Sequence, residues 1–140
     1  MCAMNEGQPS GSDLKAQNKF FKSFRYAAQG IVSAADERNF RVDIAAAACA
    51  LALCALLQVP LWGWAAVVIC IGAVLAAECV NTAIEAVVDL ASPDIHPFAK
   101  RAKDCAAGAA LILAVASVAV AGIVFIPAAW TMFLGCEPKG

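Results

Sequence analysis

Long apolar stretches separated by short polar segments dominate the chain. The first, residues 44 to 59, is interrupted only by Gln58, while the second, 61 to 77, and the third, 105 to 126, carry no charged side chain. A bilayer core about 30 Å thick requires about 20 apolar residues of helix to cross it. The pattern therefore predicts three membrane-spanning helices, over about residues 40–59, 61–90 and 100–127.

A different pattern precedes the first span. Phe20, Phe24 and Ile31 recur at helical spacing, and basic side chains occupy much of the remaining surface. Helices of this kind lie on anionic membrane surfaces, so we predict an amphipathic surface helix over about residues 14–36. Residues 1–13 are rich in Gly, Ser and Pro and are predicted to be disordered, which leaves residues 14–140 as a single membrane domain.

The second span ends in polar residues where apolar ones are expected. The stretch AECVNTAIEAVVD, residues 77 to 89, contains Glu78, Asn81, Glu85 and Asp89. At about 100° per residue these side chains fall within about 80° of one another, and at about 1.5 Å per residue they extend over about 16 Å. They form one polar stripe that starts in the bilayer and ends at its surface.

Two explanations of this stripe remain open. A helix that simply leaves the membrane with a solvated face accounts well for Asp89. It accounts poorly for Glu78, which follows seventeen apolar residues, because a lone acid at that depth costs about 2.5 kcal/mol or more. Acid and amide oxygens crowded on one face are easier to understand with a cation among them, and such hard ligands favour Mg²⁺.

The composition is typical of a membrane protein, and the distribution of basic residues predicts its orientation in the membrane. Hydrophobic residues make up 62% of the chain, against roughly 45–50% in soluble domains, and the mean hydropathy is +0.75. Of the ten basic residues, all but Lys139 fall before the first apolar stretch or between the second and third. The positive-inside rule then places the N-terminus and the loop at 90 to 103 in the cytoplasm, and the C-terminus outside.

Other sequence features restrict how the chain could bind a nucleotide or a metal ion. The chain has neither GxxxxGK[ST] nor GxGxxG, so a nucleotide would have to be held by metal and side chains. Its seven cysteines show no CxxC spacing and are interpreted as small apolar packing residues. Glu37 and Asp104 stand at the starts of the first and third spans, and Lys103 is suited to a phosphate oxygen. A charged cap at a helix start is the alternative explanation of Lys103 and Asp104.

At these positions the sequence resembles the small integral-membrane lipid kinases that include prokaryotic diacylglycerol kinase and undecaprenol kinase. The resemblance covers about residues 19 to 127, and the matching motifs keep the family's order and spacing. The motifs are ERNFR at 37 to 41, ECVNTAIEAVVD at 78 to 89, SPDIHP at 92 to 97 and AKRAKDCAAGA at 99 to 109.

The resemblance implies an all-α fold that assembles as a homotrimer in the cytoplasmic membrane, with active sites shared between neighbouring subunits at the cytoplasmic face. It implies transfer of the γ-phosphoryl group of ATP to a lipid hydroxyl with Mg²⁺ as cofactor, and no nucleic-acid partner. By position, Glu78 corresponds to the catalytic base that meets the lipid, Asn81 to its polar neighbour, and Glu37 and Glu85 to Mg²⁺ ligands that also contact the nucleotide. The further nucleotide contacts implied are Lys19, Tyr26, Asp89, Asp94, Ile95, His96, Lys103 and Asp104. Lys19 stands where some family members have arginine.

Several functions remain open on the sequence. ERNFR and SPDIHPFAK look more like the undecaprenol kinase branch than the diacylglycerol branch, so we favour undecaprenol and keep diacylglycerol as the alternative. A small proton- or cation-coupled transporter would use Glu78 as its coupling acid, although the outer halves of the spans are nearly free of ionisable groups. A membrane scaffold would tolerate Glu78→Gln without consequence.

Overall fold

The computed structural model describes residues 11–92, 94 and 96–135, and the chain divides into two compact units, Met1–Ser33 and Ala34–Gly140. The described part of the first unit is the helix α1 (Gly11–Ala34). The second unit contains α2 (Arg38–Leu56), α3 (Leu61–Ala91) and α4 (Pro97–Leu134). No strand occurs among the described residues, so the predicted all-α fold is confirmed.

The surface helix starts earlier and ends earlier than predicted. Residues 11 to 13 were expected to be disordered but form the first turn of α1. Residues 1–10 lie outside the described residues. Phe20 and Phe24 pack edge to face, with ring centroids 4.9 Å apart, and both rings remain largely exposed. An exposed aromatic face of this kind suits a membrane surface.

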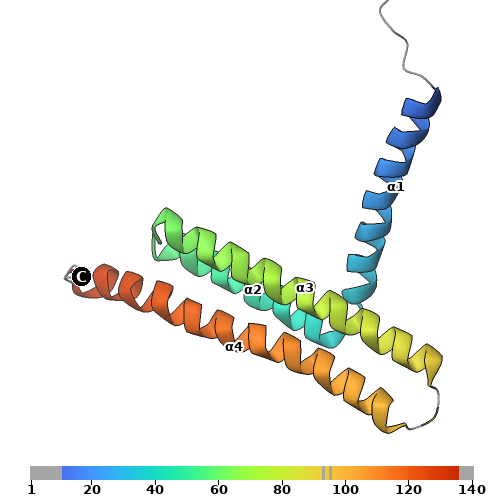
Figure 1. Cartoon of the computed structure of the whole chain (residues 1–140). Helices are drawn as coiled ribbons and strands as arrows, with labels where there is room; N and C mark the ends of the chain where they lie inside the picture. The colour runs from blue at the N-terminus through green and yellow to red at the C-terminus, as the bar shows by residue number, and fades with distance from the viewer. Residues whose placement is uncertain (1–10, 93, 95, 136–140) are drawn as a thin grey trace, which may run out of the picture. The chain divides into compact units, whose positions relative to one another are not determined.

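The three helices of the second unit lie side by side and alternate in direction (Figure 1). All three are long and apolar enough to cross a membrane, as predicted. α3 packs extensively on α4 and less on α2, whereas α2 and α4 touch little. The start of α2, the end of α3 and the start of α4 therefore meet at one end of the bundle, which we call the polar end.

Helix boundaries follow local chemistry. α2 stops at Leu56 because Gln58 adopts a left-handed backbone conformation (φ 50°) and Pro60 follows as the N-cap of α3. α4 begins at Pro97, where the His96 ring caps the helix by accepting a hydrogen bond from the backbone N–H of Phe98. It continues through Pro127 to Leu134, beyond the predicted end near residue 127. Membrane helices tolerate such a proline.

A small apolar core forms at the other end of the bundle. Cys54, Val59, Val67 and Val124 are buried there. Gly63 allows this close packing, because a Cβ at that position would come within 2.4 Å of Val59 Cγ1 and 3.0 Å of Val124 Cγ1.

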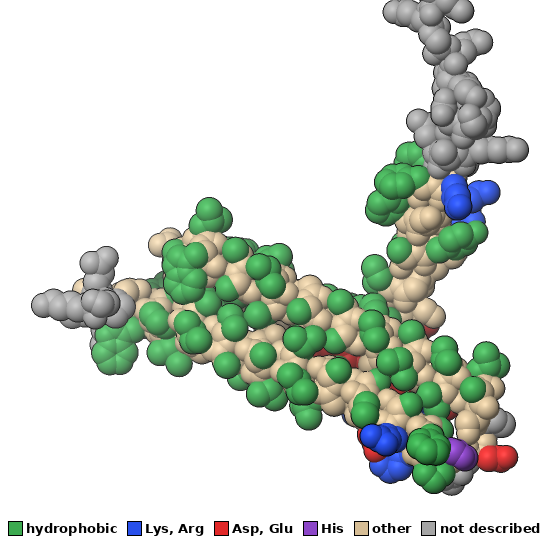
Figure 2. Space-filling model, in the orientation of Figure 1, with side chains coloured by type: hydrophobic (Ala, Val, Ile, Leu, Met, Phe, Trp, Pro, Cys, Tyr) green, Lys and Arg blue, Asp and Glu red, His purple; other side chains and the backbone are tan. Residues whose placement is uncertain are grey.

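Hydrophobic side chains are spread over the visible surface of these three helices, and charged side chains gather at the polar end (Figure 2). This is the distribution expected of a membrane bundle with a hydrated end.

Candidate active site

A cleft of about 550 Å³ opens among the three helices near the polar end. α2 contributes Arg38, Asn39 and Asp43 to its lining, and α3 contributes Glu78 and Asn81. The facing positions of α4 are mostly alanines, whose small side chains leave the space open. The deepest two members of the predicted stripe, Glu78 and Asn81, thus line a cleft between the three helices and do not form a simple solvated helix face.

Asn81 is the buried polar residue of the site, with 7% of its surface exposed. Its Nδ2 donates a hydrogen bond to Glu85 Oε1 at 2.9 Å, one turn further along α3. Its Oδ1 is buried and has no hydrogen-bond partner among the described residues. An unmet buried acceptor costs about 1–3 kcal/mol, so this amide oxygen is suited to receive a donor or a cation.

Asp43 is the residue that the sequence analysis missed. It lies inside the first membrane-spanning helix and lines the same cleft as Glu78. The signal was present, because an acid within a membrane span is unusual enough to be a candidate in itself.

Ion pairs connect the charged residues of the polar end. Lys103 Nζ donates to Asp89 Oδ1 and so joins the start of α4 to the end of α3. Lys100 pairs with Asp104 one turn away on α4. Lys103 and Asp104, adjacent in the sequence, therefore have different partners. The pairing joins Asp89 to Lys103, two of the residues that the resemblance places near the nucleotide.

The connection between α3 and α4 carries the predicted DIH motif. The backbone carbonyl of Asp94 accepts a hydrogen bond from Ser92 Oγ at 3.0 Å. The His96 ring accepts the capping bond at 3.2 Å and stacks on Phe98. His96 thus has a structural role at the start of α4 whatever else it contacts. Ile95 lies outside the described residues.

Glu37, Lys19 and Tyr26 are not among the residues that line the cleft in the described part of the chain. Glu37 is exposed at the N-cap position of α2 and makes no side-chain capping bond. Lys19 and Tyr26 belong to α1, which is described by itself; Arg25 lies over the Tyr26 ring, 5.6 Å from its centroid. Their roles at a nucleotide stay predictions.

The cleft offers oxygen atoms of the kind that Mg²⁺ prefers. Oxygen atoms come from Asp43, Glu78 and Asn81, and the Asn81 Oδ1 atom has no hydrogen-bond partner among the described residues. Glu85 is hydrogen-bonded to the amide nitrogen of Asn81. No cluster of three His, Cys, Asp or Glu side chains fit to hold a metal occurs in the described part of the chain. Mg²⁺ commonly uses one or two carboxylates and takes its other ligands from water and substrate phosphates, so a sparse protein set is sufficient.

Comparison with known proteins identifies the family. The model of the prokaryotic diacylglycerol kinase family matches residues 25–125. The undecaprenol kinase of Bacillus subtilis (strain 168) is 45% identical over 112 residues, which cover 79% of this chain and 90% of that protein. A diacylglycerol kinase of Synechocystis sp. is 40% identical over 107 residues, covering 75% of this chain and 61% of that protein. A diacylglycerol kinase of Helicobacter pylori (strain J99) is 29% identical over 121 residues.

The chain therefore belongs to the prokaryotic diacylglycerol kinase family and is a lipid kinase. This decides against the transporter and scaffold alternatives.

Proposed function

We propose that this member of the prokaryotic diacylglycerol kinase family transfers the γ-phosphoryl group of ATP to undecaprenol. The observation that carries the proposal is the position of Glu78, a carboxylate in a cleft inside a membrane bundle. A lipid alcohol can reach such a group without leaving the bilayer. The name of the Bacillus subtilis relative supports undecaprenol, and the names of the other relatives keep diacylglycerol as the alternative.

Glu78 acts in this proposal as the general base. Phosphoryl transfer requires the hydroxyl and the phosphorus to be aligned and a group within about 2.6–3.2 Å to accept the hydroxyl proton. Asn81, one turn away on the same face of α3, holds Glu85 through its amide and keeps its own carbonyl oxygen free in the buried site. The proton moves from the lipid hydroxyl to a Glu78 carboxylate oxygen.

The polar end receives ATP. Asp104 and Lys103 lie at the start of α4, and Lys103 is the less exposed member of its ion pair, at 36% of its side chain against 66% for Asp89. Its ammonium group can donate charge-assisted hydrogen bonds to phosphate oxygens. Glu85 and Glu37 would hold Mg²⁺, which when bound neutralises phosphate charge.

The proposed orientation and assembly come from the sequence. Basic residues concentrated at the polar end favour a cytoplasmic position for that end in the cell membrane. A homotrimer with shared active sites would allow α1 and Glu37 of one subunit to complete the cleft of another. Native mass spectrometry in detergent would test the trimer, and a monomer with full activity would contradict it.

The deciding experiment is a kinase assay on the purified full chain with ATP, Mg²⁺ and either undecaprenol or dioleoylglycerol. We expect transfer to undecaprenol at the higher kcat/KM. Glu78→Gln should lower kcat by about 100-fold or more, the usual contribution of general base catalysis. Glu137→Gln makes the same chemical change after the end of α4 and should leave the rate unaltered.

Each result has a distinct meaning. No transfer to either lipid refutes the kinase proposal, and transfer to dioleoylglycerol alone refutes only the choice of lipid. Full activity of Glu78→Gln would remove Glu78 as the base and leave the reaction class standing.

A further inference from the structure

Arg38 is the first residue of α2, and it is the only basic residue among the described residues that line the cleft. The same cleft is lined by the acidic side chains of Asp43 and Glu78 and by the amide of Asn81. Lys103, to which we assigned a phosphate oxygen, is not one of these lining residues. A phosphoryl group that enters the cleft therefore meets one cationic side chain, that of Arg38.

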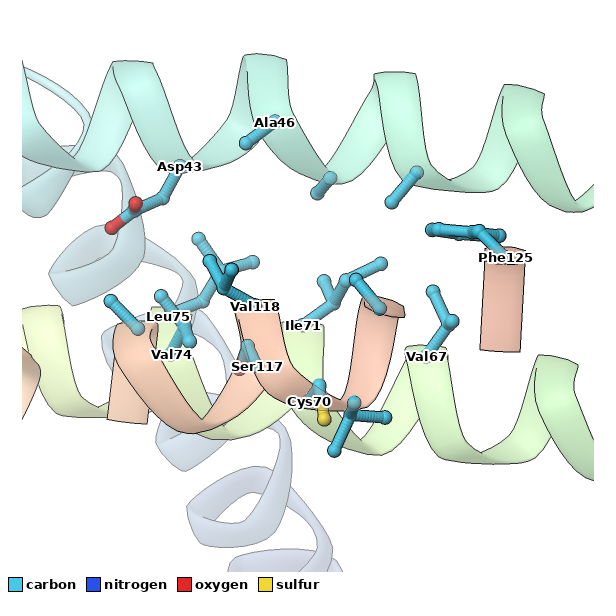
Figure 3. A pocket seen from close by; sticks show the side chains of 15 residues that line it. Asp43, Ala46, Val67, Cys70, Ile71, Val74, Leu75, Ser117, Val118 and Phe125 are labelled. Atoms are coloured by element: carbon cyan, nitrogen blue, oxygen red, sulfur yellow. The ribbon is translucent and has the colours of Figure 1, made fainter. Parts of the chain in front are cut away.

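The bundle beyond the cleft offers no second cation. A cavity of about 300 Å³ shares Asp43, Val74 and Ala114 with the cleft, and Asp43 is the only charged residue among the described residues that line it. Figure 3 shows this carboxylate at one end of the cavity, with apolar side chains such as Ile71 further along. Within the described part of the chain, Arg38 thus carries the only positive charge that lines either cavity.

The position of Arg38 is unfavourable for α2 itself. The first turn of the helix, RNFR at residues 38 to 41, contains two arginines and no acid. Positive charge at a helix N-terminus opposes the helix dipole, whose positive end lies there. Glu37 precedes the helix but makes no side-chain capping bond. Local helix stability therefore does not explain a basic residue at position 38.

Ion pairing does not explain Arg38 either. The ion pairs among the described residues join Lys100 to Asp104 and Lys103 to Asp89, and neither involves Arg38. A guanidinium group carries five N–H donors in a planar fork that matches two oxygen atoms of a phosphoryl group. Arg38 therefore brings to the cleft a donor set that suits a phosphoryl group and that no carboxylate of the described residues occupies.

We propose that Arg38 is a catalytic residue that donates hydrogen bonds to the phosphoryl group while this group passes from ATP to the lipid hydroxyl. The proposal rests on the kinase function proposed above and adds a residue to its mechanism. In the step, the lipid oxygen forms a bond to the γ-phosphorus, and the bond from that phosphorus to the β,γ-bridging oxygen breaks. The hydroxyl proton passes to Glu78, and ADP leaves with the electron pair of the broken bond. Arg38 keeps its protons and offsets the negative charge on the oxygen atoms of the transferring group.

The two cations of the mechanism then act at different places. Lys103 lies at the polar end, where ATP arrives, and Arg38 lines the cleft together with Glu78. A contact that is strongest in the transition state raises kcat, whereas a contact made equally to bound ATP lowers KM. Loss of Arg38 should therefore appear mainly in kcat.

The first test compares Arg38→Gln with Arg41→Gln in the purified full chain. Both substitutions remove one positive charge from the first turn of α2. The α2 residues that line the cleft fall within about 140° of one another around the helix, and Arg41 lies about 60° outside that range. The acceptor is whichever of undecaprenol and dioleoylglycerol the wild type phosphorylates faster. We expect Arg38→Gln to lower kcat about 100-fold, the usual loss when one donor to developing charge is removed, with little change in KM for ATP. Arg41→Gln should match the wild type.

Chemical rescue distinguishes contact with the reacting group from a structural role. Guanidinium chloride at a concentration too low to unfold the protein should raise the kcat of Arg38→Ala severalfold, because the free ion can occupy the vacated position. Methylammonium chloride has the same charge without the planar fork and should not. The unfolding midpoint of Arg38→Ala should equal or exceed that of the wild type, because the removed charge opposes the helix dipole.

An anionic lipid headgroup offers the same phosphate chemistry, so the assay is run in two environments. One is dodecyl maltoside without phospholipid, and the other is nanodiscs that contain phosphatidylglycerol. An arginine that only meets headgroups at the membrane surface would lower the rate on substitution in the nanodiscs alone. We expect the loss of kcat in Arg38→Gln to be the same in both.

The outcomes separate this inference from the kinase proposal. Inactive wild-type protein refutes the proposed function and this inference with it. Active wild-type protein with an equally active Arg38→Gln variant overturns this inference alone. Equal losses in Arg38→Gln and Arg41→Gln, a raised KM for ATP with unchanged kcat, failure of guanidinium to rescue, or a lowered unfolding midpoint would each overturn it too. A loss confined to the nanodiscs assigns Arg38 to a lipid headgroup and also overturns it.

Discussion

Asp89 and Lys103 join the end of α3 to the start of α4, and replacing them singly and together tests which of the two meets the nucleotide. The variants are Asp89→Asn, Lys103→Gln and the double substitution. Lys103 donates to a phosphate oxygen in our proposal, and we predict that Asp89, given above as an implied nucleotide contact, acts only by holding Lys103. The alternative is that Asp89 contacts the nucleotide or its metal directly.

The expected magnitudes follow from the exposure of the pair. A hydrogen bond to a charged group contributes about 1.5–3 kcal/mol, so Lys103→Gln should lower kcat/KM for ATP by about 10- to 150-fold. The side chains of Lys103 and Asp89 are 36% and 66% exposed, and exposed ion pairs contribute about 0.2–1 kcal/mol. Asp89→Asn alone should therefore cost no more than about fivefold.

The double variant gives the decisive comparison. If Asp89 acts only through Lys103, adding Asp89→Asn to Lys103→Gln should change kcat/KM for ATP by less than about twofold, because the interaction is already lost. The assay is steady-state phosphorylation with ATP varied at a fixed concentration of undecaprenol. Arg101→Gln, which removes a nearby exposed positive charge from α4, serves as the control for net charge. A loss above about tenfold for Asp89→Asn that multiplies with the Lys103→Gln loss would refute the reasoning.

Three further substitutions have expected outcomes. Asn81→Leu removes both the hydrogen bond to Glu85 and the unpartnered buried oxygen. We therefore expect its free energy of unfolding to stay within about 1 kcal/mol of the wild type, while kcat falls more than tenfold. A fully active variant would show that the amide is dispensable. Gly63→Ala places a Cβ within 2.4 Å of Val59 Cγ1 and should destabilise the bundle by about 1–3 kcal/mol in thermal unfolding. The control Gly72→Ala, whose added Cβ would have no atom within 4 Å, should leave stability unchanged. Equal unfolding midpoints of the two variants would contradict the close packing at Gly63. His96→Ala removes the N-cap of α4 and should cost about 0.5–2 kcal/mol, with His96→Asn restoring most of it; no loss would show that the cap is unimportant.

The spans were predictable because crossing a bilayer requires a long apolar helix, and few other structures satisfy that requirement. The ends of the spans were less predictable. α4 continues through Pro127, since a proline that would stop a helix in water is tolerated within a membrane span. α4 also begins earlier than predicted, because the His96 ring provides a cap that an ordinary list of capping residues omits.

The stripe on α3 was predictable for a different reason. Its residues lie on one continuous helix, so their common face follows from helical periodicity alone, and the hydrogen bond between Asn81 and Glu85 agrees with it. Asp43 was not predictable in this way. Its meeting with Glu78 depends on how α2 is rotated against α3, and that rotation is set by packing between helices.

A lipid kinase must bring together two substrates that prefer opposite environments, and the cleft lies where the apolar bundle meets its polar end. Because residues of all three helices line this cleft, their alignment depends on the packing of the whole bundle. A change at the distant apolar core, such as Gly63→Ala, should therefore lower kinase activity as well as thermal stability. Full activity of a destabilised Gly63→Ala variant would show that the cleft does not depend on the distant core.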